Sequence, residues 1–383
     1  MGDGEAAAGP PVGARTARRG DARTAHAYLG SFTSAGGHGI TTASADPVTG
    51  ELTALHHTGS AVADPSYLAL GAGVLYAVSE TTEGAAAAFS LARPERPAPL
   101  GGPVPVRGAG PTHLASAGGR LFTANYTSGS VSALPLRADG SLGGQARVRR
   151  HEGRGPVAER QEGPHAHAVA PDPSGRWLLA VDLGTDSVHV YDLRDGSQGP
   201  DQGPDGEGPL PHREVPLRAG TGPRHLVFHP GGARAYVINE LAPTVTTCRW
   251  NAADGSLESL RETALLPTEP TGDAPAYPSA LVLSADGRFA WAAVRGRDHI
   301  AVLALGADGD GMELVTAVPC GGHWPRDLAL HPSGRWLYVA NERSGDIARF
   351  TLDPASGVPA YAGSFPAPAA SCVVFAPGAP EGS

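Results

Sequence analysis

Residues 163–193 read GPHAHAVAPDPSGRWLLAVDLGTDSVHVYDL. A short apolar run follows a proline, and a Pro-Ser-Gly-Arg turn separates it from a second apolar run, Trp177 to Val181. A polar turn then leads into an alternating run, Ser187 to Leu193. Short runs rich in apolar and β-branched residues, separated by Gly, Asp and Ser, are typical of antiparallel strands. This stretch therefore predicts a small sheet built from consecutive strands.

The same order of elements recurs along the chain. The prolines that open the related segments are Pro65, Pro111, Pro164, Pro223, Pro278 and Pro325, spaced 46 to 59 residues apart. Self-similarity at about this period indicates a propeller or a solenoid. A fourth, more polar run, such as Glu258 to Leu265, ends most units, and no long stretch has a convincing helical period. The unit therefore predicts a four-stranded propeller blade.

The two ends of the chain complement each other. Residues 26–55 resemble a blade that lacks its first strand, and the orphan run Ser371 to Ala376 can supply that strand. Six full units and this composite predict an all-β, seven-bladed β-propeller, with four antiparallel strands per blade and the first blade closed by the N- and C-terminal strands. We expect a single propeller domain over residues 26–383, a disordered tail over 1–25 and a mobile insertion over 196–211.

Composition narrows the class of protein. The chain has 383 residues, of which 53 are Gly and 36 Pro, as turn-rich β proteins have. The formal net charge of -9 argues against binding to nucleic acid or to an acidic membrane surface. No apolar run could span a membrane, and no signal-peptide core follows Arg18 and Arg19, so we expect a cytoplasmic monomer or weak homodimer. The three cysteines, Cys248, Cys320 and Cys372, form neither a disulfide framework nor a zinc pattern.

The repeat also predicts where a ligand binds. The first strand of each propeller blade lines a central channel, and ligands usually bind where these strands and the adjoining loops meet. Polar residues after the repeat prolines are His113, His165, His167, Arg224, His225, Arg326 and Asp327. Polar residues that end the second strands are Glu80, Asn125, Tyr126, Asp182, Asn239, Glu240, Arg295, Asn341 and Glu342. For Asp182, Asn125 and Asn341, turn capping is the simpler role.

One subset of these residues combines groups suited to catalysis: His165, His167, Arg224, Glu240 and Arg295. Imidazole exchanges protons near neutral pH, and guanidinium grips carboxylate or phosphate with paired hydrogen bonds. The alternative is that these charges only neutralise one another across a wet channel. The two histidines are two residues apart on a strand and share one side, but no third metal ligand lies nearby in sequence, so we expect neither a metal nor another cofactor.

The units resemble the bacterial lactonase family of seven-bladed propellers, the cycloisomerase-type 6-phosphogluconolactonases, over about residues 26–376. The matching motifs are GPHAH at 163–167, GPRH at 222–225, NE at 239–240, RG at 295–296, PRD at 325–327, AYLGSFT at 27–33 and TGEL at 49–52. The resemblance implies His165, His167, Glu240 and Arg295 as catalytic residues. Around them we expect Arg224, His113, Asn239, Asp182 and Arg326 to bind substrate. One departure is Ala293-Val294, where the family usually has Ser-Asn.

The expected function is hydrolysis of a small anionic sugar lactone in the central channel by metal-free acid/base catalysis. Arg224 and Arg295 would bind the anionic group and the developing oxyanion. His165 or His167 would activate water or protonate the ring oxygen, and Glu240 would hold that histidine or act as the base. Two alternatives stay open: a cyclase or lyase that acts on a carboxylated metabolite, and a non-catalytic binding propeller. The chain lacks the repeated Trp-Asp ends of protein-binding propellers.

Overall fold

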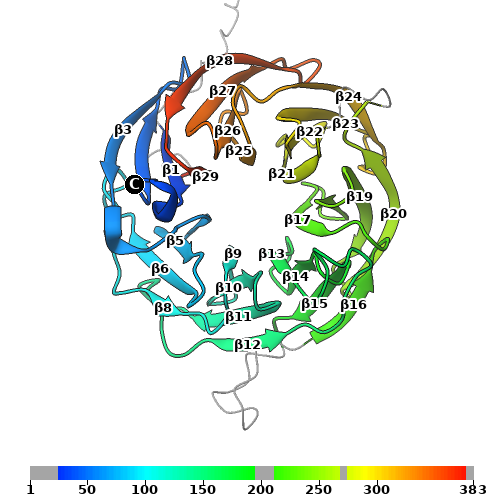
Figure 1. Ribbon diagram of the computed structural model, residues 1–383, viewed down its shortest axis with the longest axis horizontal. Helices are drawn as coiled ribbons and strands as arrows, with labels where there is room; N and C mark the ends of the chain where they lie inside the picture. Colours follow the sequence, from blue (N-terminus) through cyan, green and yellow to red (C-terminus); the bar gives the residue numbers. More distant parts are fainter. Residues whose placement is uncertain (1–24, 195–210, 268–273, 377–383) are drawn as a thin grey trace, which may run out of the picture.

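The computed structural model describes residues 25–194, 211–267 and 274–376, which form seven β-sheets in a ring around a central axis (Figure 1). The fold is therefore the predicted all-β, seven-bladed propeller. The predicted tail and insertion fall almost wholly outside the described residues, but Ala25 already belongs to the first strand and Pro211 opens another strand.

The blades follow one another around the ring in chain order. The first contains β29 (Ala370–Phe375), β1 (Ala25–Ser31), β2 (Thr41–Ala45) and β3 (Leu52–His57), and the second β4 (Leu68–Gly71), β5 (Val74–Ser79), β6 (Ala85–Ser90), β7 (Ala98–Pro99) and β8 (Val104–Pro105). The third contains β9 (Pro111–Ala117), β10 (Arg120–Asn125), β11 (Ser130–Pro135) and β12 (Arg147–Arg150). The fourth contains β13 (Ala166–Pro171), β14 (Trp177–Asp182), β15 (Ser187–Asp192) and β16 (Pro211–Pro216).

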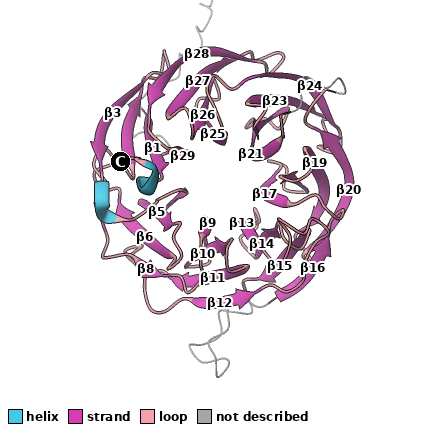
Figure 2. Cartoon of the chain, in the orientation of Figure 1, coloured by secondary structure: helices cyan, strands magenta, loops and turns pink. Residues whose placement is uncertain are grey.

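The remaining three blades have the same antiparallel order. The fifth contains β17 (Pro223–Phe228), β18 (Arg234–Asn239), β19 (Thr244–Asn251) and β20 (Ser256–Ala264). The sixth contains β21 (Tyr277–Leu283), β22 (Phe289–Arg295), β23 (His299–Leu305) and β24 (Met312–Pro319), and the seventh β25 (Pro325–Leu330), β26 (Trp336–Asn341), β27 (Asp346–Leu352) and β28 (Pro359–Pro366). The only helices among the described residues are two short 3₁₀ turns, Thr33–Ala35 and Gly59–Ala61 (Figure 2). Neither is long or apolar enough to cross a membrane.

The ring closes through the composite first blade. The C-terminal strand β29 pairs with β1, with Tyr28 opposite Val374 and Leu29 opposite Val373. In Figure 1 the red end of the chain accordingly lies beside its blue beginning. Because this pairing gives β1 a partner on each side, the first blade has four strands like its neighbours, and the two ends of the chain are held together. The sequence-based prediction of this closure is confirmed.

Apolar side chains fill the spaces between neighbouring blades. Val181 of β14, for example, packs in one cluster with Val237 of β18 and Trp250 of β19. Full burial of one such aliphatic side chain contributes roughly 1.5–3 kcal/mol. Aromatic residues on the second strands also bind the next blade: the Tyr236 hydroxyl donates to the Gly309 carbonyl at 2.8 Å, and Tyr338 does so to Gly50 at 2.6 Å. These contacts hold adjacent blades at a constant spacing and position the residues at the channel.

Candidate active site

Three channel residues sit on β-bulges at equivalent places in the ring. In blades four, five and seven the pairing register shifts around His167, Arg224 and Arg326, between the first and second strands. A bulge re-aims the side chain of the extra residue and is common next to active sites. The labelled first strands, among them β13, β17 and β25, lie nearest the axis in Figure 1, and each bulged residue is the second residue of its strand.

The strand register shows how the fourth blade aligns with the fifth. In the fifth blade Pro223 pairs with Asn239, the last residue of β18. In the fourth blade the residue that pairs with Asp182, the last residue of β14, is Ala166 and not Pro164. The residue equivalent to Arg224 is therefore His167. His165 precedes strand β13 and lies in the connection from the previous blade. This distinction between the two histidines could not be read from the GPHAH motif, in which the proline suggested the wrong alignment.

Glu240 is the centre of a group of buried charges. Its Oε1 accepts a hydrogen bond from Arg160 Nη2 at 2.6 Å. Its Oε2 lies 2.8 Å from Arg295 Nη2 and 3.0 Å from Arg224 Nε. Only 7% of the Glu240 side chain is exposed, compared with 3% for Arg224 and 8% for Arg295. Three guanidiniums therefore share one carboxylate, which leaves an excess of two positive charges in a largely buried place.

These charges control the protonation of Glu240. Burial by itself would raise the pKa of Glu240, but the charges of Arg295 and Arg224 outweigh it and hold that pKa well below its usual range. The same crowding acts on Arg224, whose pKa burial and the neighbouring Arg295 lower to about 9. Glu240 is consequently a permanently ionised anchor for arginines and a poor acceptor of protons. Of the two roles predicted for it, holding its neighbours fits this environment and acting as a base does not.

His167 lies beside this group in neutral form. Burial, followed by the charge of Arg224, lowers the pKa of His167 well below its ordinary value. Its Nε2 is 3.9 Å from Glu240 Oε2, which is ion-pair range but too long for a hydrogen bond. Its buried Nδ1 has no hydrogen-bond partner among the described residues. A neutral imidazole with a free ring nitrogen is available to accept a proton.

His165 has a different environment. Its ring stacks on Tyr126 with centroids 4.5 Å apart, and its Nδ1 donates to the Tyr126 carbonyl at 3.0 Å. Its Nε2 lies 3.2 Å from the exposed carboxylate of Glu162. His167 touches the same tyrosine ring edge-on, with centroids 5.5 Å apart. Tyr126 thus separates a histidine with occupied nitrogens from one with a free nitrogen, and of these two histidines it is His167 that lies within ion-pair range of Glu240.

Arg160 was not predicted from the sequence. It comes from the loop over residues 152–162, which lies outside the repeat, so no rule about strand ends could select it. Its guanidinium reaches Glu240 across the channel mouth and also bonds to Tyr126, and these partners raise its pKa despite partial burial. About a third of the Arg160 side chain is exposed, at 35%, so it is the most accessible of the three arginines.

A cluster of neutral aromatic rings adjoins this group. His113 packs against Tyr67 with centroids 4.1 Å apart and against His225 at 5.2 Å. Burial, followed by the charge of Arg224, lowers the pKa of His113 to about 3, and burial also keeps His225 uncharged. His225 Nε2 is 3.2 Å from Arg224 Nη1. His113, predicted as a substrate-binding residue, therefore belongs to the aromatic cluster next to Arg224.

Two other predicted substrate-binding residues lie within turns. The Asp182 side chain is fully buried, and its Oδ1 accepts hydrogen bonds from the backbone N–H groups of His165, Gly184 and Thr185. The fully buried Asn239 amide donates to Thr244 and Thr246. Turn capping, the simpler alternative, describes Asp182, and the Asn239 amide joins β18 to β19; a contact of either residue with substrate stays a prediction. Arg326 has partly exposed contacts on the opposite side of the channel.

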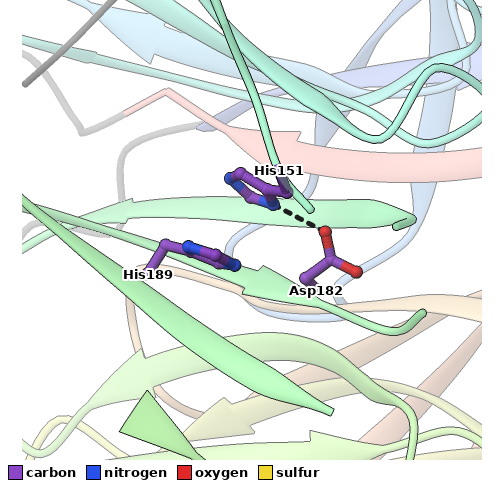
Figure 3. A group of neighbouring side chains, drawn as sticks. All are labelled: His151, Asp182 and His189. Carbon is purple, nitrogen blue, oxygen red and sulfur yellow. Dashed lines mark hydrogen bonds and ion pairs between the residues drawn. The ribbon is translucent and has the colours of Figure 1, made fainter. Parts of the chain in front are cut away.

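Asp182 also belongs to the one group in the described part of the chain with the composition of a metal site: His151, Asp182 and His189 (Figure 3). His151 Nδ1 donates to Asp182 Oδ2 at 2.6 Å, and its Nε2 lies 2.7 Å from the Tyr191 hydroxyl. The His151 and His189 rings stack with centroids 3.7 Å apart. Both nitrogens of His151 are thus engaged, and stacked rings do not aim their lone pairs at one point. The donors form a hydrogen-bonded chain and do not fit a bound metal.

Comparison with known proteins assigns the chain to a family. Residues 26–375 match the family model described as Lactonase, 7-bladed beta-propeller. The 6-phosphogluconolactonase of Bacillus subtilis (strain 168) is 32% identical over 337 residues, 86% of this chain and 92% of that protein. A putative 6-phosphogluconolactonase from Bacteroides fragilis superposes with a TM-score of 0.83 at 30% identity, covering 94% of this chain and 100% of that one. For the periplasmic gluconolactonase PpgL of Pseudomonas aeruginosa the TM-score is 0.84 at 31% identity, with 92% and 99% covered.

The protein is a seven-bladed propeller with a buried group of arginine, glutamate and histidine side chains. This combination is that of a propeller enzyme. The chain belongs to the lactonase family of seven-bladed β-propellers. The resemblance predicted from the GPHAH, GPRH and NE motifs is confirmed, and the protein is a lactonase.

Proposed function

We propose that this protein hydrolyses 6-phosphogluconolactone or a closely similar anionic sugar lactone at the Glu240 group. The observation that carries the proposal is the imbalance of charge there: Arg160, Arg224 and Arg295 surround a single carboxylate. Guanidiniums that remain uncompensated in a poorly solvated place bind a phosphate or carboxylate with paired hydrogen bonds. The names of the Bacillus and Bacteroides relatives support the choice of a phosphorylated lactone.

In the proposed reaction, His167 is the general base. A water molecule attacks the lactone carbonyl, and its proton passes to the free nitrogen of His167 while a new carbon–oxygen bond forms. Arg295 stabilises the negative charge that develops on the carbonyl oxygen, while Arg224 and Arg160 hold the phosphate. The ring carbon–oxygen bond then breaks, the ring oxygen takes the proton from His167, and the open hydroxy acid releases a proton to solvent on ionisation.

Substrate binding would also make His167 a stronger base. Burial and the charge of Arg224 keep the pKa of His167 low in the empty site. An anion bound to the arginines offsets the charge of Arg224, so the pKa of His167 rises toward the range in which imidazole accepts protons effectively. The proposed mechanism needs no metal, because Arg295 stabilises the oxyanion and the histidine moves the proton. Glu240 would keep the arginines in place.

The test is a pH-stat assay of acid release from 6-phosphogluconolactone, corrected for spontaneous hydrolysis, with the unphosphorylated gluconolactone alongside. We expect kcat/KM to favour the phosphorylated lactone by about 100-fold or more, since two charge-assisted contacts are lost without the phosphate. Arg224→Ala should abolish most of this preference, whereas Arg249→Ala, which removes a surface arginine paired with Glu258, should leave it unchanged. Equal rates for both lactones, or a wild-type preference in Arg224→Ala, would refute the proposal.

A further inference from the structure

A second group of charges lies on the other side of the channel mouth. Arg326 of β25 in the seventh blade has Nη2 3.4 Å from Glu80 Oε2 and Nη1 3.3 Å from Glu342 Oε2. Glu80 follows β5 in the second blade, and Glu342 follows β26 in the seventh. The Ser66 hydroxyl donates to Glu80 Oε2, and the Arg326 guanidinium lies over the Phe32 ring at 4.9 Å. This group therefore joins blades on both sides of the composite blade.

The repeat places the two groups at equivalent positions. Arg326 lies on the bulge of the seventh blade that corresponds to the bulge at Arg224 in the fifth. Glu342 follows Asn341 at the end of β26, as Glu240 follows Asn239 at the end of β18. The charge balance is reversed, however. We call Arg160, Arg224, Arg295 and Glu240 the arginine-rich half of the mouth, and Arg326, Glu80 and Glu342 the glutamate-rich half. The first half has three cations for one anion, and the second has two anions for one cation.

The glutamate-rich half is also loose and accessible. Its ion pairs are 3.3 to 3.5 Å long, compared with 2.6 to 3.0 Å around Glu240. Its side chains are 18% to 24% exposed, so its carboxylate oxygens keep lone pairs that are free to accept further hydrogen bonds. An ionised carboxylate accepts hydrogen bonds and donates none. It therefore binds hydroxyl groups and repels another carboxylate or phosphate.

The two halves are connected through the sixth blade. Arg224 donates a hydrogen bond to the Ser279 carbonyl, and the Ser279 hydroxyl donates to the carbonyl of Pro325, the residue before Arg326. After burial and nearer charges, the charge of Arg326 also contributes to the lowered pKa of Arg224 and of His167. A ligand that spans the mouth would accordingly meet cations at one end and hydrogen-bond acceptors at the other. Such a ligand carries one anionic group and several hydroxyls.

We propose that Glu80 and Glu342 form a hydroxyl-recognising subsite, which selects polyhydroxylated lactones and rejects ligands with a second acidic group. The proposal rests on the proposed function, since it names the part of the same site that recognises the sugar ring. Such a subsite would also favour lactone hydrolysis over ring closure of a carboxylated metabolite. A carboxylated metabolite for ring closure would bring a second anion against Glu80 and Glu342, whereas a sugar lactone would bring hydroxyl donors.

The test compares two competitive ligands by calorimetry and by inhibition: glucitol 6-phosphate, which has one anionic group and several hydroxyls, and adipate, which has two carboxylates and no hydroxyl. Wild-type protein should bind glucitol 6-phosphate at least about 100-fold more tightly. In Glu80→Gln with Glu342→Gln, the affinity for glucitol 6-phosphate should fall by about 10-fold, because charge-assisted hydrogen bonds become neutral ones. Adipate should bind more tightly, since the repulsion is gone and Arg326 is released.

Glu83→Gln is the matched control, because Glu83 is an exposed carboxylate in the turn just after Glu80 and should alter neither affinity. Thermal melting confirms that each variant is folded. An unchanged ratio of the two affinities in the folded double variant would overturn the subsite, and so would wild-type protein that binds neither ligand. Wild-type protein that shows the predicted binding and the predicted loss, yet hydrolyses no lactone, would refute the proposed reaction and support the subsite.

Discussion

The arginine-rich and glutamate-rich halves of the channel mouth use the same repeat positions for opposite purposes. Around Glu240 the contacts are short and the side chains are 3% to 8% exposed, apart from the loop residue Arg160. Around Arg326 the contacts are longer, and the side chains are 18% to 24% exposed. Burial makes each charge in the first half dependent on its partners, while solvent screens those of the second. Equivalent positions of one propeller can thus hold a tightly paired buried group of charges and a looser, partly exposed one.

The largest effect that separates the two halves should come from Glu240→Gln. Removing this charge leaves three guanidiniums, two of them deeply buried, without their anion, and we expect the free energy of unfolding at pH 7 to fall by about 3–5 kcal/mol. Glu258→Gln, which breaks the exposed Arg249–Glu258 pair, is the control and should cost less than about 1 kcal/mol. Urea denaturation of the three proteins measures both values, and equal losses would show that burial adds nothing to the contribution of Glu240.

The same residue predicts a dependence on pH. The pKa of Glu240 is lowered in the folded protein, so its contribution to stability is complete above the unfolded value of about 4.3 and is lost as the pH falls below it. Wild-type protein should therefore lose stability between about pH 5 and pH 3 more steeply than Glu240→Gln does. Parallel slopes in denaturation experiments over that range would show that Glu240 is not held in its ionised form.

A smaller effect, on rate alone, should distinguish the two histidines. His167→Gln should lower kcat by about 100-fold or more, because it removes the proposed base. His165→Gln should keep kcat within about 10-fold of wild type, since the nitrogens of His165 are already bound to Tyr126 and Glu162. Since the pKa of His167 lies well below 6.5, kcat/KM should stay level from pH 8 to pH 6.5 and decline only in more acidic solution. The reverse order of the two variants would assign the proton transfer to His165.

Arg160→Ala should have a moderate effect on binding. Because Arg160 is the accessible member of the arginine-rich half and lies on a loop, we expect KM for the phosphorylated lactone to rise about 10-fold with kcat within about 3-fold. Arg160→Lys should recover part of the loss, since it keeps the charge but not the forked geometry. Steady-state kinetics at low and high salt measure the change. A large fall in kcat with constant KM would instead give Arg160 a part in the chemical step.

The smallest effect is expected for Glu342→Gln on stability. Its ion pair with Arg326 is 3.3 Å long and partly exposed, so the free energy of unfolding should change by less than about 1 kcal/mol. The same substitution should alter ligand selectivity. A loss comparable to that of Glu240→Gln would mean that the two halves are equally rigid, and the division between them would fail.

The sequence by itself determined the blades, the ring closure and most of the residues at the channel. Strand alternation and turn composition are local properties, and the repeat shows which positions are equivalent, so Arg224, Glu240 and Arg295 could be selected without coordinates. The same reasoning listed Glu80 and Glu342 but could not show that they share Arg326, because these contacts join blades at opposite ends of the chain. The repeat gives Asp182 and Asn239 positions at strand ends, and only the structure shows that Asp182 accepts backbone hydrogen bonds and that Asn239 joins neighbouring strands.

Tertiary structure decided how these residues act. Arg160 reaches Glu240 from a loop 80 residues earlier in the chain, and a bulge at His167 aligns it with Arg224, which leaves His165 outside the strand. Neither a loop's path nor a bulge follows from residue type, because both depend on what packs against the backbone. The charge states depend on burial as well: the low pKa values of Glu240 and His167 arise only when the folded ring removes water from the arginines around them.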